Sequence, residues 1–317
     1  METTQIQIGN WPVQIGETRF LEEKQKNELV KLVTNWARVE VSLRKKDLVP
    51  ISAVRNFGVP TIFCRVDLAP FVVGEYPINK VYEIEARPAG FSILLNIFPK
   101  LKSIGSIWEN HLPISAVVLD SRQDAAEDTR IFSEAMNWGW LEQNNCENNF
   151  SECMWVRGSE LDIKNVDLAK LEEKALAPVT SHGDKNYLVE MNLAKKIGNH
   201  DKLPWDEPFV IKPLKGSKCD NVFLWHPAER KKNTSGIYTR TKISNSLLDT
   251  DRQFILQPFI FPGREEINGK EGFTIWRIYF GYDIQNRKWI FAGGLWNWRP
   301  CLKVHGASDG ISGPLLV

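Results

Sequence analysis

The sequence predicts a mixed α/β (α+β) protein, and three features of the chain support this fold class. Residues 20–46 have the spacing of an amphipathic helix, with apolar positions at Leu29, Leu32, Val33 and Trp36. Residues 100–178 alternate apolar segments with helical patterns, which is typical of a small parallel α/β unit. Beyond residue 178, short apolar segments joined by brief connections indicate mostly antiparallel strands.

The individual elements follow from the same patterns. Two strands are expected at 59–73 and 80–90, joined by a turn at 74–79. The central region predicts a strand at 112–120, a helix at 121–139, a strand at 151–158 and a helix at 165–176. The last third predicts a helix at 181–198 and strands at 208–214, 221–226, 253–261, 273–283 and 288–300.

The composition indicates a soluble globular protein with two or three domains. The chain has 317 residues, of which 43% are hydrophobic and 25% charged. A net charge of +1 gives no global electrostatic reason to expect nucleic acid or a membrane as partner. Five cysteines without CxxC spacing argue against zinc and disulfides. With no signal peptide or membrane segment recognisable, we expect a cytoplasmic protein.

Several common chemistries lack support in the sequence. There is no GxxxxGK[ST] phosphate loop, and the strand-to-helix turn after residue 118 has no GxGxxG. "GASDG" at 306–310 matches the GxSxG of serine hydrolases, but no histidine follows it in the chain. "KCDN" at 218–221 is one residue short of the KxDG of nucleotidyl-transferring ligases.

Two glutamates stand two positions apart in the strand "VYEIEARPAG" at 81–90. Alternate residues of a strand share a face, so Glu83 and Glu85 are expected on one side and Ile84 on the other. Two adjacent like charges repel unless a cation lies between them. That cation could be Arg87, a lysine from elsewhere or a metal ion. The alternative is a surface strand whose glutamates pair with Arg65 or Arg87.

The segment "PFVIKPLKGSKCDNVFLW" places a lysine inside an apolar strand and a flexible loop after it. A lysine such as Lys212 is rarely buried without an anionic partner. Gly216 and Ser217, flanked by lysines, belong to a loop whose backbone N–H groups could surround phosphates. The alternative is a surface hairpin with an edge lysine.

Three further polar residues interrupt apolar strands near the end of the chain. Gln257 in "QFILQPFI" could offer its amide to an adenine edge, or it could be a buried glutamine satisfied within the protein. Arg277 and Arg299 lie among apolar and aromatic residues, where guanidinium groups call for phosphate or carboxylate partners.

Taken in order, "GDKNYL", "FVIKPLKGS", "FILQPFI" and "IWRIYF" resemble the nucleotide-binding half of an ATP-grasp enzyme. The resemblance implies ATP contacts from two lysines, a glycine-rich loop and a hinge strand. The corresponding residues are Lys185, Lys212, Gly216, Ser217, Gln257, Phe259 and Ile260. It also implies that Arg277 faces the phosphates. Pro258 departs from the glutamate often found at the hinge, and Glu265 or Glu266 would be the acid near the ribose.

The magnesium-binding hairpin of that family normally follows these motifs, whereas its match here lies near the N-terminus. Asp67 and Glu83 match the family's acids, and Glu85 stands where asparagine is usual. The chain therefore resembles a circularly permuted ATP-grasp protein. Its expected parts are a metal-binding half at 1–99, an inserted pre-grasp-like α/β domain at 100–178 and an ATP-binding lobe at 179–317. Permutation also predicts that the two chain ends lie close together, far from residue 100.

The resemblance implies an ATP- and Mg²⁺-dependent ligase that activates a carboxylate as an acyl phosphate for attack by an amine. Arg277 and Arg299 would be its catalytic residues, and the acyl acceptor and donor would be small or peptide-like molecules. The implied substrate-binding residues are Arg87, Lys303, His305, Ser308 and Asp309. A phosphotransferase on the same fold and a nucleotide-binding module without turnover are the alternatives.

Overall fold

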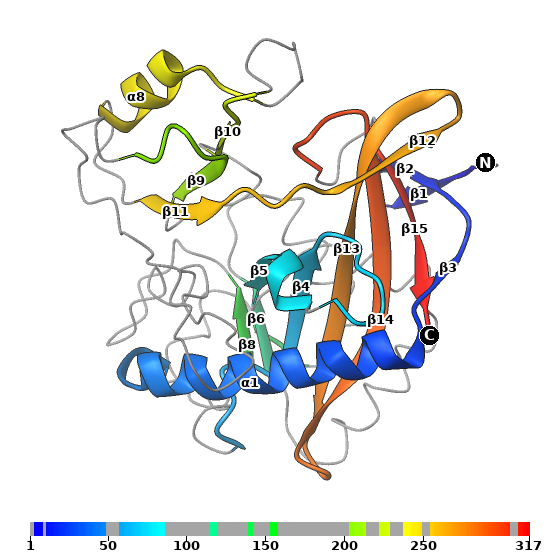
Figure 1. The fold of residues 1–317 in the computed structure, drawn as a ribbon. Helices are drawn as coiled ribbons and strands as arrows, with labels where there is room; N and C mark the ends of the chain where they lie inside the picture. Colours follow the sequence, from blue (N-terminus) through cyan, green and yellow to red (C-terminus); the bar gives the residue numbers. More distant parts are fainter. Residues whose placement is uncertain are drawn as a thin grey trace.

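The computed structural model describes most of the two ends of the chain and three short strands between them. The described residues are 3–8, 11–48, 57–75, 77–85, 115–118, 139–141, 153–157, 203–213, 222–228, 237–248, 254–304 and 310–317. The fold is mixed α/β and contains one large sheet, in agreement with the predicted class (Figure 1).

The large sheet has nine strands drawn from both ends of the chain. Its central order is β1-β2-β15-β14-β13-β4-β5, with β12 added to β13 and β3 added to β15. The N-terminal strands are β1 (Thr4–Ile8), β2 (Trp11–Ile15), β3 (Arg19–Phe20), β4 (Phe63–Leu68) and β5 (Val81–Glu85). The C-terminal strands are β12 (Gly263–Ile267), β13 (Lys270–Asp283), β14 (Lys288–Arg299) and β15 (Ile311–Leu316).

Several predicted elements of this sheet are confirmed, with shorter or longer bounds. The expected strand at 59–73 shortens to β4, and the expected strand at 80–90 is confirmed as β5 up to Glu85, beyond which residues 86–90 lie outside the described residues. The 3-10 turn η1 (Pro77–Lys80) precedes β5. The strands β13 and β14 pair antiparallel over almost their whole length, as expected. Strands β1, β2, β3, β12 and β15 were not predicted, because none of them carries a long apolar or alternating pattern.

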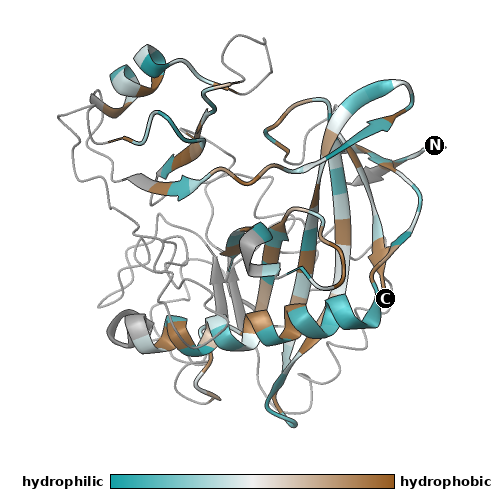
Figure 2. Ribbon diagram, viewed as in Figure 1, coloured by the Kyte–Doolittle hydropathy of each residue, from teal (hydrophilic) through white to brown (hydrophobic). Residues whose placement is uncertain are grey.

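Helix α1 (Glu23–Leu48) covers one face of the large sheet (Figure 1). The predicted apolar positions Leu29, Leu32, Val33 and Trp36 are at most 4% exposed. Trp36 packs on Trp289 of β14, with ring centroids 6.4 Å apart. Polar and apolar residues alternate along the helix in Figure 2, as expected for a helix with one buried stripe.

The two chain ends lie together in this sheet. Strand β15 pairs parallel with β2 at Ile311 and Gln14, and with β3 at Leu316 and Phe20. The marks N and C in Figure 1 lie on the same side of the molecule. The predicted proximity of the ends is therefore confirmed, whereas residue 100 lies outside the described residues. Circular permutation itself stays a prediction, as does the division into three domains.

A close approach between β15 and β14 explains why residue 313 is a glycine. A Cβ added to Gly313 would lie 2.3 Å from Nε1 of the Trp296 indole, which is fully buried beneath it. The Trp296 Nε1–H donates to the Glu17 carbonyl at 2.9 Å, so the ring also joins the N-terminal segment to the sheet. A larger residue at 313 would displace this ring.

Two smaller sheets complete the described structure. Strand β9 (Phe209–Pro213) lies between β10 (Phe223–Trp225) and β11 (Phe254–Pro258), both antiparallel to it, as predicted. Helix α8 (Arg240–Leu248) was not predicted, and its Ile243 and Leu247 pack on Phe209 and Trp225 in an apolar cluster.

Strand β6 (Ser115–Val118) lies between β7 (Gly139–Leu141) and β8 (Cys153–Arg157) in the third sheet, and both pairings are parallel. The parallel arrangement predicted for β6 and β8 is confirmed. Strand β7 was not predicted, and it begins at Gly139, which the sequence indicated as the end of a helix. The predicted helices at 121–139, 165–176 and 181–198 otherwise lie outside the described residues.

Candidate metal and nucleotide site

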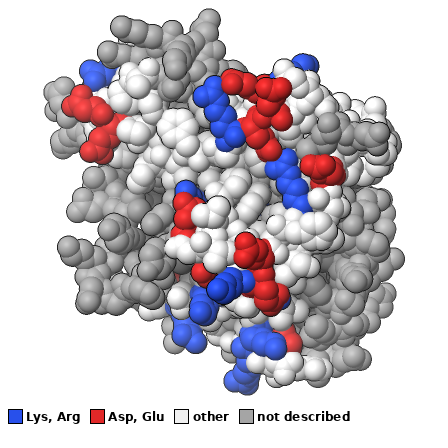
Figure 3. Space-filling view, turned by 45° about the vertical axis from the view of Figure 1, so that its right-hand side comes forward, with Lys and Arg blue, Asp and Glu red and all other residues white. Residues whose placement is uncertain are grey.

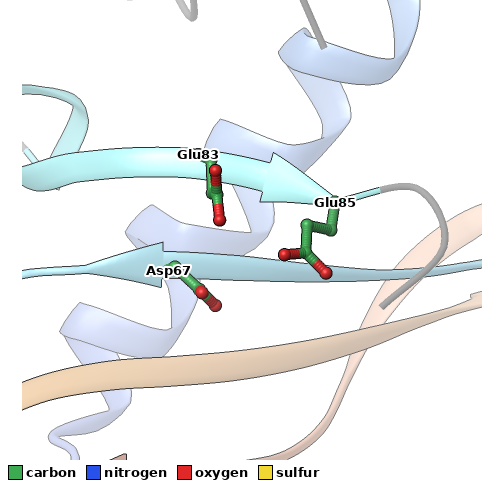
Figure 4. A group of neighbouring side chains, drawn as sticks. All are labelled: Asp67, Glu83 and Glu85. Atoms are coloured by element: carbon green, nitrogen blue, oxygen red, sulfur yellow. The ribbon is translucent and has the colours of Figure 1, made fainter. Parts of the chain in front are cut away.

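Three carboxylates gather where β4 and β5 pair. Asp67 lies directly opposite Glu83 in the antiparallel register, and Arg65 lies opposite Glu85. One oxygen from each of Asp67, Glu83 and Glu85 lies within 4.8 Å of the others (Figure 4). Ile84 between the glutamates is only 5% exposed. The predicted shared face of Glu83 and Glu85 is therefore confirmed, and Asp67 joins it.

The carboxylates lie on the face of the large sheet opposite helix α1. Asp67 pairs with Arg277 of β13, whereas Tyr282, five residues further along β13, points to the other face. Tyr282 pairs with Trp289, and the two rings meet edge to face with centroids 5.4 Å apart, while Trp289 contacts α1 through Trp36. The face that carries the acids is thus free of α1 and accessible to another part of the chain.

Arg65 lies within this acidic group and contacts two of its members. Its Nε donates to Asp67 Oδ1 at 2.5 Å, and its Nη2 donates to Asp67 Oδ2 and to Glu85 Oε1, both at 2.8 Å. The Arg65 side chain is 4% exposed and that of Asp67 is 6% exposed. The alternative in which Arg65 pairs with a glutamate is therefore correct for Glu85. The strand that carries the glutamates, β5, is half-buried and ends the strand order of the large sheet.

Lys212 reaches the acids from the second sheet. Its Nζ lies 3.5 Å from Glu83 Oε2 and donates to the Tyr82 carbonyl at 3.2 Å. Its side chain is 12% exposed, and β9 is the central strand of its sheet. The edge-lysine alternative is therefore wrong, and the predicted anionic partner is Glu83. Lys212 is therefore a lysine from another part of the chain of the kind expected as a counter-charge for these glutamates.

Arg277 of β13 completes the charged group. Its Nε lies 3.5 Å from Asp67 Oδ2, too long for a strong hydrogen bond, and this buried atom has no hydrogen-bond partner among the described residues. Three carboxylates are therefore matched by three cations that come from β4, β9 and β13. Predicted metal ligands and predicted ATP-binding residues meet at one point, although they are far apart in the sequence.

The environment of Glu85 favours its neutral form. Burial raises the pKa of Glu85 to about 7, with Glu83 and Asp67 acting in the same direction and Arg65 and Arg277 against them. Its side chain retains 32% exposure, so one side of the group faces solvent. The pKa of Arg65 is held above its usual range, because Asp67 and Glu85 outweigh the effect of burial. Arg65 is a permanent cation.

The donor chemistry of the three acids fits a hard divalent cation. Mg²⁺ takes carboxylate oxygens and completes its shell with water and phosphate oxygens. Asp67, Glu83 and Glu85 offer such oxygens from two neighbouring strands, and Glu83 and Glu85 are partly exposed. Lys212 and Arg277 beside them would suit the phosphates of a bound nucleotide.

Arg299 and Lys303 form a second polar group at the end of β14. Arg299 Nη1 donates to the Lys303 carbonyl at 2.8 Å, and Lys303 Nζ donates to Tyr238 Oη at 2.8 Å. Arg299 pairs with Phe273, four positions along β13 from Arg277, and shares the face of the acids. Its predicted catalytic role and the predicted substrate-binding role of Lys303 stay predictions.

The predicted hinge residues lie along one edge of the second sheet and just beyond it. Gln257 pairs with Val210 next to Lys212, and the Phe259 N–H donates to the Pro208 carbonyl at 3.2 Å. The ring of Phe259 contacts those of Phe261 and His226, with centroids 4.6 and 6.1 Å away. Phe259 and Ile260 are half-buried. Adenine contacts for these residues stay predictions.

Seven predicted site residues lie outside the described residues, namely Lys185, Gly216, Ser217, Arg87, His305, Ser308 and Asp309. Of the two acids considered for the ribose, Glu265 is directed to the α1 face, because it shares the side of Thr274 and Arg19. Glu266 is exposed on the other side. In this structure Glu265 is paired with Arg19, and a ribose contact for either acid stays a prediction.

The sequence analysis missed two polar features of the acid-bearing face. Arg65 was considered only as a surface partner, although its position two residues before Asp67 in "FCRVDL" puts both on one face. Asn297 is 4% exposed and accepts from Ser312 Oγ at 2.8 Å, while its Nδ2 has no hydrogen-bond partner. No sequence pattern marks Asn297, because its partner comes from an unpredicted strand.

The surface charges on one face of the molecule are mixed in sign. Figure 3 shows acidic and basic residues side by side on one face of the molecule, with no large area of one sign among the described residues there. Within the described part of the chain, no helix has the length and apolar character needed to cross a bilayer.

Comparison with known proteins gives weak structural likenesses. No family model matches the chain, and no curated protein matches it. A solved structure of a candidate gamma-glutamylcysteine synthetase from Methylobacillus flagellatus KT is 10% identical, with 91% of this chain and 86% of that one covered and a TM-score of 0.41. A glutathione synthetase-like effector from Globodera pallida, without ligand, is 10% identical, with 93% and 87% covered and a TM-score of 0.40. Because both TM-scores are low, we base no functional conclusion on either likeness.

Proposed function

We propose that this protein is a Mg²⁺- and ATP-dependent ligase that joins a carboxylate to an amine. The observation that carries the proposal is the convergence of Asp67, Glu83, Lys212 and Arg277 at one point between two sheets. The sequence motifs independently indicate Asp67 and Glu83 as metal ligands and Lys212 and Arg277 as phosphate contacts. A surface strand with chance ion pairs would not bring them together from three separate segments.

In the proposed reaction the acids hold Mg²⁺, which would neutralise phosphate charge and orient the γ-phosphoryl group. A carboxylate oxygen of the substrate attacks that phosphorus, the bond to the leaving oxygen of ADP breaks, and an acyl phosphate forms. The amine nitrogen then attacks the acyl carbon, and phosphate leaves. An amide, ADP, phosphate and a released proton are the products, so no oxidant or other reactant is needed.

The cationic side chains have separate tasks in this scheme. Lys212 would exchange its contact with Glu83 for a phosphate oxygen when nucleotide enters. Arg277, whose Nε has no hydrogen-bond partner, would stabilise the charge that develops on the transferred group. Arg299, on the same face and four positions along β13–β14, would hold the carboxylate or acyl phosphate. No side-chain nucleophile is required.

The proposal is tested first by nucleotide binding. We expect a non-hydrolysable ATP analogue to bind in calorimetry with Mg²⁺ and to lose at least about tenfold in affinity with EDTA or in Glu83→Gln. Glu271→Gln is the matched control, because Glu271 is an exposed glutamate of the same sheet whose partner is Arg264. Absence of binding under all conditions, or equal binding by Glu83→Gln, contradicts the proposal.

Turnover distinguishes the ligase from its alternatives. Incubation with ATP, a panel of carboxylates and hydroxylamine should yield hydroxamates, because hydroxylamine traps acyl phosphates. ADP formation with a stable phosphorylated product and no hydroxamate would indicate a phosphotransferase. Tight Mg²⁺-dependent binding with no ADP under any substrate would indicate a nucleotide-binding module.

A further inference from the structure

Arg65 places a fixed positive charge inside the acidic group that the proposed function assigns to Mg²⁺. Its guanidinium is fully engaged with Asp67 through two parallel hydrogen bonds and with Glu85 through a third. Such a fork cannot be deprotonated in a protein, and its 4% exposure keeps water from replacing it. Arg65 is therefore a resident cation of the site.

The position of Arg65 is determined by three strands. It pairs with Glu85 of β5 on one side and with Tyr279 of β13 on the other. Phe63, two residues earlier in β4, packs on Tyr279 at 6.0 Å beside it. The side chain consequently has little freedom to leave when another cation arrives.

Arg65 is bound within the acidic group, whereas Lys212 and Arg277 each approach a single carboxylate at 3.5 Å. In the proposed function these two side chains turn to phosphate, so Arg65 is the cation that stays with the carboxylates. Three of the six carboxylate oxygens, both of Asp67 and one of Glu85, already accept hydrogen bonds from Arg65. The ligands on the other side of the group are the Glu83 carboxylate and the second oxygen of Glu85.

The same geometry leaves little room for a second ion. In two-metal sites the ions lie about 3.5–4 Å apart and share carboxylate ligands. Here the Arg65 guanidinium already lies between two of the carboxylates that such ions would share, because it bridges Asp67 and Glu85. A second ion would have to break a buried bidentate pair, which is costly.

We propose that the site takes a single divalent cation, and that Arg65 is the internal cation that occupies the place of a second. Arg65 is in this sense a positioning residue, because it holds Asp67 and Glu85 side by side and limits how many ions they bind. The inference rests on the proposed function, since it concerns the ion that accompanies the nucleotide.

Mn²⁺ is the probe that tests this inference, because it is paramagnetic and prefers the same oxygen ligands. We expect equilibrium dialysis of the wild-type chain with one equivalent of a non-hydrolysable ATP analogue to retain one Mn²⁺ per chain. Electron paramagnetic resonance should show an isolated ion. Two retained ions with an exchange-coupled spectrum would overturn the inference and leave the proposed function intact. No retained Mn²⁺ would overturn the proposed function as well.

Variants of Arg65 then test whether this side chain limits the number of bound ions. We expect Arg65→Gln to retain a second Mn²⁺ or to bind the first about tenfold more tightly, because one positive charge is lost. Arg19→Gln is the matched control, since Arg19 forms a similar pair on the other face, and it should retain one ion with unchanged affinity. Arg65→Gln with one ion and unchanged affinity would overturn the role of Arg65. If circular dichroism shows that Arg65→Gln is unfolded, the number of Mn²⁺ ions retained by the wild-type chain decides whether the inference holds.

Discussion

The large sheet carries an arginine–carboxylate fork on each face, and the two forks differ in what surrounds them. On the α1 face, Arg19 donates from Nη1 and Nη2 to the two oxygens of Glu265, both at 2.9 Å. On the opposite face, Arg65 makes the corresponding fork with Asp67. The side chains of the first pair are 24% and 30% exposed, and those of the second 4% and 6%.

The neighbours of each fork separate a structural contact from a candidate site. Arg19 also lies over the Trp296 ring at 3.9 Å, and Glu265 also contacts the Thr274 hydroxyl, so the charges of that pair match one to one. Around Arg65, two further acids and two further cations converge, one of them from another sheet. A fork by itself is therefore no sign of function, whereas further charged side chains brought to it from separate segments are.

The two forks should differ most in the stability that is lost when the arginine is replaced. Arg65→Met leaves three close carboxylates without their buried partner, and we expect a loss of about 3–5 kcal/mol in the free energy of unfolding. Urea denaturation followed by circular dichroism measures it. A loss under about 1 kcal/mol would show that the acids do not depend on Arg65.

The free energy of unfolding should depend on pH because of Glu85 on the acid-bearing face. Its pKa of about 7 in the folded chain lies above its ordinary value of 4.5. Between these values the folded chain holds a proton that the unfolded chain has released, so its contribution to stability falls as pH rises from about 4.5 to 7. We expect a loss of about 1–3 kcal/mol across this window in EDTA. Glu85→Gln should flatten the curve, and an unchanged curve would contradict the assignment.

Removing the charge of one acid on each face of the sheet should affect nucleotide binding in one case and stability in the other. Glu83→Gln keeps the shape of the side chain, and we expect it to lower Mg²⁺–nucleotide affinity about tenfold or more with little change in unfolding. Glu265→Gln should leave that affinity unchanged and lower the free energy of unfolding by about 1 kcal/mol, because it weakens the fork with Arg19. Calorimetry and urea denaturation on both variants test the pattern. If instead Glu265→Gln lowered the nucleotide affinity and Glu83→Gln lowered only the stability, the functional acid would lie on the α1 face.

The smallest effect is expected for Arg19. Arg19→Met retains part of the contact with the Trp296 ring but loses the fork, so we expect a loss of about 1 kcal/mol, partly screened by salt. Measuring the loss at low and high salt concentration checks the charge component. A loss as large as that of Arg65→Met would remove the distinction between the two forks.

Local patterns in the sequence were sufficient for the two glutamates, for Lys212 and for helix α1, whereas Asp67 was chosen from the family resemblance. The alternation around Ile84 put Glu83 and Glu85 on one face, and the spacing of Leu29 and Trp36 gave helix α1. Lys212 was recognised because a lysine in an apolar strand requires an anion. Each of these inferences uses the periodicity of a single element or the cost of burying a single charge.

The features that the sequence did not predict depend on pairings between distant segments. Strand β15 pairs with β2 and β3, β2 pairs with β1, and β13 pairs with β12. These pairings hold the strands in the sheet, so none of them needs a strong hydrophobic pattern of its own. Glu265 was considered for a nucleotide because the family resemblance implies an acid near the ribose, and no local pattern indicates its partner Arg19, which lies 246 positions away. The contact between Lys212 and Glu83 likewise spans 129 positions, and nothing local in either segment specifies the other.

The placement of β13 beside β4 also bears on how the chain folds. Strands β4 and β5 are close in sequence and can pair early, but at that stage their three acids have only Arg65 as a counter-charge. Arg277 and Lys212 arrive from segments formed much later in synthesis, and closing such long loops is slow. Repulsion among the acids thus opposes the early hairpin, and their cationic partners join only in the late steps of folding.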